Sequence, residues 1–106
     1  SEARCFCYIS DAINALTLLM NNTDSKNEIY NIGTNEEIKI NDIISTLENI
    51  HHQPISPIYE EFKNAGTKRR VPDISKITKL GFNPKVSFKD GLQLSYDWYS
   101  THYLSN

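Results

Sequence analysis

Two arginine-bearing stretches, far apart in the chain, contain residue types suited to holding an anion. The first, residues 4–11, begins with Arg4, and the second, residues 68–76, carries Arg70 three residues before Asp73. A guanidinium group is planar and permanently charged, and its N–H donors match two oxygens of a phosphate or carboxylate at once. Because the two arginines are so distant in sequence, only the fold can bring them to one site.

Tyr59 and Lys63 have the spacing of a proton-transfer pair. Residues i and i+4 share one face of a helix, and a lysine in that position lowers the pKa of the tyrosine. This segment, however, follows Pro57 and alternates in polarity as a strand does, which would keep the two side chains apart along an extended chain. We therefore expect no catalytic residue in this chain.

Cys5 and Cys7 are the two cysteines of the chain. Two residues apart on a strand, they would point to the same face, where they are poorly placed to bridge to each other. A metal site would need them to act with His51 and His52, and the sequence contains no second cysteine pair to support one. We interpret them as small apolar side chains in a reducing, cytoplasmic environment, and we expect no metal.

The four glycines lie at positions 33, 66, 81 and 91. None belongs to the closely spaced cluster that holds the pyrophosphate of a dinucleotide at a helix N-terminus. We therefore expect no cofactor-binding residue in this chain.

Composition narrows the choice of partners. The net charge is −2, with acids and bases interspersed, which argues against a general electrostatic binder of nucleic acid. No apolar run approaches the ~18 residues that span a bilayer, and no secretory leader is evident. We expect a partner that is neither nucleic acid nor membrane.

The hydrophobic pattern predicts a mixed α and β fold of the α/β class, with about four helices and four short strands. Strands are expected over residues 5–9, 28–32, 37–40 and 58–62. Helices are expected over residues 11–21, capped by Asp11 or Ser10, over 42–51, capped by Asn41, from Asp73 to Leu80, and from Ser87 onward. We expect the aromatic residues of the last helix, Tyr96, Trp98 and Tyr99, to lie in the core.

Gly81 is placed to end the third helix. A glycine just after a helix adopts a left-handed backbone conformation, and the residue that follows then packs back on the last turn. Here Phe82 would pack on Ile77, and Pro84 would prevent the helix from continuing.

These pieces, in this order, resemble the C-terminal, nucleotide-sugar-binding part of the extended short-chain dehydrogenases, the NAD-dependent epimerases and dehydratases. The resemblance covers nearly the whole chain. It is carried by Arg4-x-Phe6-x-Tyr8-x-x-Asp11, Tyr30-Asn31-Ile32-Gly33, Arg70-x-x-Asp73-x-Ser75-Lys76, Leu80-Gly81-x-x-Pro84, Gly91-Leu92 and Trp98-Tyr99.

The resemblance implies that residues 4–106 are the substrate-binding domain of a Rossmann-type enzyme. Because the first residue is not Met, we expect residues 1–3 to be a remnant of cloning. The NAD-binding half would be a separate part of the protein, upstream of this one. It would hold NAD or NADP and supply the catalytic tyrosine and lysine. The parent protein would be an NAD-dependent enzyme, and this part alone is predicted to be inactive.

The resemblance also implies roles for single residues. The arginines that match Arg4 and Arg70 reach the substrate diphosphate, so these two are predicted to clamp it from two sides. Asp73 is predicted either to contact the nucleotide or to cap a helix, and both roles are compatible. Arg69 and Lys68 are expected to be surface charges.

Two alternatives remain open at this point. The chain could be a stand-alone, non-catalytic module that binds a nucleotide or a protein. It could also be a structural domain without a ligand, which would be favoured if Arg4 and Arg70 lay far apart. Under the interpretation as part of an enzyme, a chain that lacks its NAD-binding half would expose an apolar face meant for that half, and this face would favour self-association into a homo-oligomer.

Overall fold

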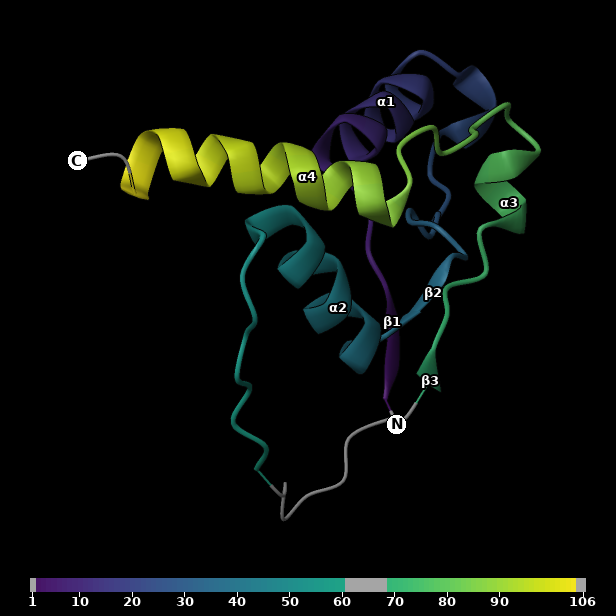
Figure 1. Ribbon diagram of the computed structural model, residues 1–106. Helices are drawn as coiled ribbons and strands as arrows, with labels where there is room; N and C mark the ends of the chain where they lie inside the picture. Colours follow the sequence, from purple (N-terminus) through teal and green to yellow (C-terminus); the bar gives the residue numbers. More distant parts are fainter. Residues whose placement is uncertain (1, 61–68, 105–106) are drawn as a thin grey trace.

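The computed structural model describes residues 2–60 and 69–104 (Figure 1). The expected mixed α and β class is confirmed, with four α-helices and three strands within the described residues. In chain order the elements are β1 (Ala3–Cys5), α1 (Ile9–Met20), the 3₁₀ turn η1 (Thr23–Ser25), β2 (Glu37–Lys39), α2 (Ile40–His51), β3 (Arg69–Arg70), α3 (Ser75–Thr78), α4 (Phe88–Tyr99) and the π-helical turn η2 (Ser100–Leu104).

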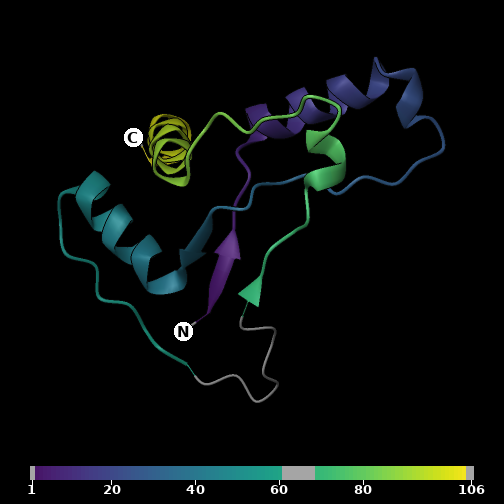
Figure 2. The same cartoon turned by 90° about the vertical axis from the view of Figure 1, so that its right-hand side faces the viewer.

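The first strand, β1, is the centre of the sheet. The strand order is β2-β1-β3, with β1 antiparallel to β2 and parallel to β3. Figure 2 shows α1 and α4 beyond the end of β1 and α2 beside the sheet. Ala3 belongs to β1, and the carbonyl of Glu2 accepts a hydrogen bond from Ile40 N at 3.0 Å. These two residues are therefore part of the fold, and their origin in cloning stays a prediction.

The expected strand over residues 5–9 is too long and begins too late. β1 ends at Cys5, and α1 already begins at Ile9 after Tyr8, so neither Ser10 nor Asp11 is its cap. Asp11 does not cap the helix because its side chain binds a distant segment of the chain. The Asp11 carboxylate is 1% exposed and accepts hydrogen bonds from Lys85 N and Val86 N, each at 3.0 Å.

Residues 28–32 do not form the expected strand. Their polar groups form hydrogen bonds with α3 and with the residues just before it, and not with a neighbouring strand. Lys76 Nζ donates to the Ile29 carbonyl at 2.7 Å and lies 2.9 Å from the Glu28 carboxylate, while Asn31 Nδ2 donates to the Asp73 carbonyl. Of the other expected strand, residues 58–60 are not strand, and residues 61 and 62 lie outside the described residues.

The predicted helix ends at Ser87 and Gly81 are found in the structure, and the one at Asn41 is not. α2 begins at Ile40, directly after β2, so the expected cap at Asn41 is wrong. α4 begins after Ser87, whose hydroxyl accepts a hydrogen bond from Asp90 N at 3.2 Å, as predicted. Gly81 has φ 103°, and Phe82 N donates to the Ile77 carbonyl at 3.3 Å, which is the predicted left-handed helix end.

The apolar core is small for a chain of this length. The buried apolar residues among those described are Ala15, Ile77 and Phe82, and the partly buried apolar neighbours that pack against them are Leu18, Leu19, Tyr30, Ile32 and Ile74. The chain exposes 8412 Å², whereas a compact monomer of this mass exposes about 6,100 Å². Its radius of gyration is 16.7 Å, against about 13 Å for a compact domain of this length. The molecule is flat, with extents of 49 × 38 × 18 Å.

We predict that Gly81→Ala lowers the free energy of unfolding by on the order of 1 kcal/mol, because only glycine adopts φ 103° without strain. A Cβ at this position would meet no described atom within 4 Å, so the cost is in the backbone. Urea denaturation followed by circular dichroism measures the change, with the exposed Asn83→Ala as control. Equal midpoints for the two variants would show that the left-handed conformation is not required.

We predict a larger loss for Asp11→Ala, on the order of 3 kcal/mol, because the part-buried N–H groups of residues 85 and 86 would both lose their acceptor. Asp11→Asn keeps one acceptor oxygen and should lose less. The exposed Asp24→Ala is the matched control in the same denaturation series. If Asp11→Ala were no worse than Asp24→Ala, the carboxylate would not be holding residues 85 and 86 in place.

Candidate functional site

The structure brings Arg4 and Arg70 together. They are direct partners in the parallel pairing of β1 with β3. Neighbouring strands lie about 4.8 Å apart, and residues paired across them project from the same face of the sheet. The two arginines that the sequence singled out therefore occupy neighbouring positions on one face.

Arg4 is partly buried and has an acid within reach. Its Nη1 donates to the Ala3 carbonyl at 2.8 Å, and its Nη2 lies 3.6 Å from the Glu2 carboxylate. The Arg70 side chain is exposed, and it makes no hydrogen bond or ion pair within residues 2–60 and 69–104. A guanidinium group has five N–H donors, so both side chains retain capacity to bind an anion on this face.

Arg69 projects from the opposite face and is more than a free surface charge. Its Nε donates to Glu37 Oε1 at 2.6 Å and its Nη2 to Glu37 Oε2 at 2.9 Å. This hydrogen bonding lowers the pKa of Glu37 and raises the pKa of Arg69. Sequence reasoning missed the pair because it depends on the register of β2 and β3. Lys68 lies outside the described residues.

Asp73 acts as a helix cap. Its Oδ1 accepts a hydrogen bond from Ser75 N at 2.9 Å, at the first residue of α3, and this bond lowers the pKa of the carboxyl group. The formal cap position belongs to Ile74, one residue later than predicted. The side chain is exposed, and its contact with a nucleotide stays a prediction.

The other chemical candidates do not join the pair formed by Arg4 and Arg70, and Cys5 projects from the opposite face of the sheet. Cys5 and Cys7 are free thiols, and burial raises the pKa of both, which disfavours the thiolate. Within residues 2–60 and 69–104, no group of three or more His, Cys, Asp or Glu is placed to hold a metal ion. Nδ1 of His51 lies 2.7 Å from the Tyr96 hydroxyl. Tyr59 is exposed, and Lys63 lies outside the described part of the chain.

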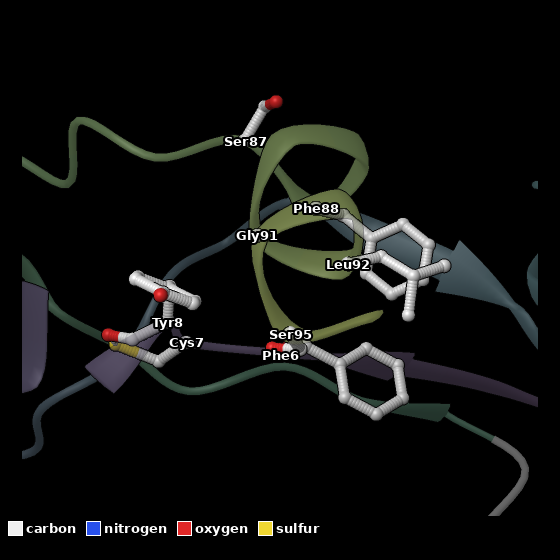
Figure 3. Close-up of a pocket in the computed structure, with 8 residues that line it drawn as sticks. All are labelled: Phe6, Cys7, Tyr8, Ser87, Phe88, Gly91, Leu92 and Ser95. Atoms are coloured by element: carbon white, nitrogen blue, oxygen red, sulfur yellow. Dashed lines mark hydrogen bonds between the residues drawn. The ribbon is translucent and has the colours of Figure 1, made fainter. Parts of the chain in front are cut away.

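A cavity of about 200 Å³ lies between the link that follows β1 and the first turns of α4 (Figure 3). The Phe6 and Phe88 rings are 5.3 Å apart, and Tyr8 packs so closely on Gly91 that a Cβ there would lie 3.2 Å from its ring. Gly91 inside a helix was the available sequence signal for this approach. The lining is largely apolar, so the cavity is not itself an anion site. It is formed by Phe6, Cys7, Tyr8, Ser87, Phe88, Gly91, Leu92 and Ser95.

An exposed apolar surface extends from α1 to α4, and we call it the α1–α4 surface. A second hollow, of about 370 Å³ and lined in part by Ile9, Trp98 and Tyr99, joins the two helices. Trp98 is 48% and Tyr99 55% exposed, so the expected burial of these two rings is wrong for this chain, whereas Tyr96 is half-buried. Ile13, Leu16 and Met20 are exposed and follow Ile9 along the same face of α1, while the Tyr103 ring of η2 packs 5.6 Å from the rings of both Trp98 and Tyr99. The members of the surface are therefore Ile9, Ile13, Leu16, Met20, Trp98, Tyr99 and Tyr103.

Within the described residues, none of the helices combines the length and the apolar character needed to cross a membrane. No family model matches the chain.

Curated proteins match the chain over most of its length. It is 31% identical to GDP-L-fucose synthase 1 of Arabidopsis thaliana over 99 residues, which is 93% of this chain and 30% of that protein. It is 33% identical to UDP-glucuronic acid decarboxylase 3 of the same plant over 95 residues, 89% of this chain and 27% of that protein. The chain thus spans less than a third of the length of these relatives.

Solved structures show the same relation. The UDP-glucuronic acid 4-epimerase from Bacillus cereus, in complex with UDP-glucuronic acid and NAD, superposes with a TM-score of 0.88 at 33% identity, over 96% of this chain and 33% of that one. An epimerase from Methanothermobacter thermautotrophicus superposes with a TM-score of 0.91 at 21% identity, over 98% and 32%, which shows the fold alone. The family expected from the sequence is therefore confirmed: this chain is a relative, over nearly its whole length, of the NAD-dependent nucleotide-sugar epimerases, dehydratases and decarboxylases of the extended short-chain dehydrogenase family.

Proposed function

We propose that this chain is the substrate-binding part of an NAD-dependent nucleotide-sugar epimerase, dehydratase or decarboxylase, and that Arg4 and Arg70 clamp the diphosphate of the substrate. The observation that carries the proposal is the pairing of these two residues across β1 and β3. It also removes the observation that would have favoured a structural domain without a ligand, namely arginines that lie far apart.

The chemistry of a diphosphate fits this face. A diphosphate linking a nucleoside to a sugar carries close to two negative charges and presents oxygens on both phosphorus atoms. Two guanidinium groups on neighbouring strands repel each other when no anion lies between them. A diphosphate would relieve that repulsion and accept charge-assisted hydrogen bonds from both side chains, in competition with Glu2 for Arg4.

The relatives support the diphosphate as the shared target. Their names include a guanosine-linked and a uridine-linked substrate, and the bases and sugars of these differ. The nucleoside diphosphate group is common to both. A site retained in the segment that this chain shares with all of them is therefore best suited to that common group.

We propose further that the α1–α4 surface is covered by the NAD-binding part of the intact protein. The relatives are about three times longer than the matched segment, and the Bacillus cereus epimerase contains NAD. The chain exposes roughly 2,000 Å² more than a compact monomer would, an excess on the scale of a protein interface. This excess of surface speaks against the alternative of a stand-alone module.

The arginine clamp predicts a selective loss of affinity. In the complete protein that contains this chain, Arg70→Ala should weaken binding of uridine or guanosine diphosphate by about 1.5–3 kcal/mol, the scale of a charged hydrogen bond. NAD affinity should be unchanged, and the exposed Lys89→Ala should bind both ligands as wild type does. Titration calorimetry measures all of these affinities. Unaltered diphosphate binding by Arg70→Ala would exclude it from the clamp.

The α1–α4 surface predicts a contrast between two equivalent substitutions. Ile13 is 53% exposed on this surface, and Ile29, in the segment between η1 and β2 whose carbonyl binds Lys76 of α3, is 86% exposed. In the complete protein, Ile13→Glu should lower the melting temperature clearly more than Ile29→Glu, because only Ile13 would be buried against the NAD-binding part. In the 106-residue chain alone the two should differ little. Sedimentation of that chain tests the rival occupant: a dimer that Ile13→Glu dissociates would assign the surface to a second copy.

A further inference from the structure

The ion pair of Arg69 and Glu37 joins two strands that are not neighbours. Arg69 lies on β3 and Glu37 on β2, with β1 between them. Two strand spacings amount to roughly 10 Å between the outer backbones, a distance that only long side chains can close. The contact is bidentate, at 2.6 and 2.9 Å, so both the position and the orientation of the guanidinium plane are fixed.

The central strand leaves room for this contact. Ala3 is the partner of Arg69, and Cys5 is the partner of Glu37, so all four side chains project from one face. Ala3 and Cys5 are small, and the ion pair passes over them. Glu37 and Arg69 both influence the pKa of the Cys5 thiol, in opposite directions, as expected for charges that lie close above it.

β3 has few other determinants of its register. Its described part is Arg69–Arg70, it pairs only with β1, and Pro72 follows two residues later without an N–H to donate. A short edge strand of this kind is weakly specified by backbone hydrogen bonds alone. A slip by one residue would turn Arg69 toward the face of Arg4 and Arg70 away from it, since successive side chains alternate.

We propose that the Arg69–Glu37 pair is a positioning element of the diphosphate site: it holds β3 in the one register that presents Arg70 beside Arg4. This inference rests on the proposed function of those two arginines. The pair projects from the face opposite Arg4 and Arg70, so it would not contact a diphosphate bound between those two arginines. It acts through Arg70, because a strand whose Arg69 is held by Glu37 on one face must project Arg70 from the other. A lysine at position 69 would keep the charge but would lack the fork that grips both carboxylate oxygens.

The test is a double-mutant cycle in the complete protein, with uridine diphosphate and NAD as calorimetric probes. Glu37→Gln should weaken diphosphate binding by roughly three- to fivefold and leave NAD binding unchanged. The same substitution made in an Arg70→Ala background should have no further effect, because its influence passes through Arg70. Glu60→Gln, at an exposed acid away from the sheet, is the control. Exchange of the two charges, Glu37→Arg with Arg69→Glu, should recover part of the affinity that either single change loses.

The outcomes separate this inference from the function on which it rests. If Arg70→Ala weakens binding and Glu37→Gln does not, the clamp stands and the positioning role is overturned. If the two losses simply add in the double variant, the ion pair supports the fold without acting through Arg70, and the inference is again overturned. If neither substitution affects diphosphate binding, both proposals fall. Non-additive losses with partial recovery on charge exchange support the positioning role.

Discussion

The parallel pairing of β1 with β3 is the contact on which the candidate site depends. It joins the third and fourth residues to residues 69 and 70, and so closes most of the chain into one loop. The cost in chain entropy of closing a long loop grows only slowly with its length. The short pairing of β1 with β3 nevertheless offers few backbone hydrogen bonds to offset that cost. The side chains must contribute, and the bidentate Arg69–Glu37 pair is a described contact that ties β3 to the far strand of the sheet.

The small core places a second constraint on the molecule. Burial of apolar surface is the main stabilising contribution to most folds, yet the described core consists of three fully buried apolar residues around α1 and α3. Directed polar contacts hold much of the remainder, including the Asp11 carboxylate on residues 85 and 86 and Lys76 on residues 28 and 29. The rings of α4 that would complete an apolar core face outward. Such a molecule is suited to packing against another body.

Sequence reasoning succeeded where the determinant is local and failed where it is tertiary. The left-handed Gly81 and the Ser87 cap follow from residues a few positions away, and both were predicted. The start of α1 was misplaced because Asp11, a typical capping residue, bonds to a segment more than seventy positions later. For the same reason the register that sets Arg4 beside Arg70, and the partner of Arg69, could not be read from the sequence. The resemblance to a family identified the two arginines as a candidate pair, and only the fold shows that they are neighbours in the sheet.

The two faces of the sheet differ in how far their arginines are neutralised by acids, and this difference favours an anionic ligand on one face. On one face Glu37 neutralises Arg69, and on the other Glu2 only partly engages Arg4, while Arg70 has no acidic partner in the described part of the chain. The second face therefore carries an excess of positive charge, which an anion with two charges on adjacent groups would balance. In the proposed clamp, recognition would depend on the phosphates and would take no account of base or sugar. Discrimination among nucleotide sugars would then come from residues beyond these two arginines, and relatives with different substrates could share the same diphosphate anchor.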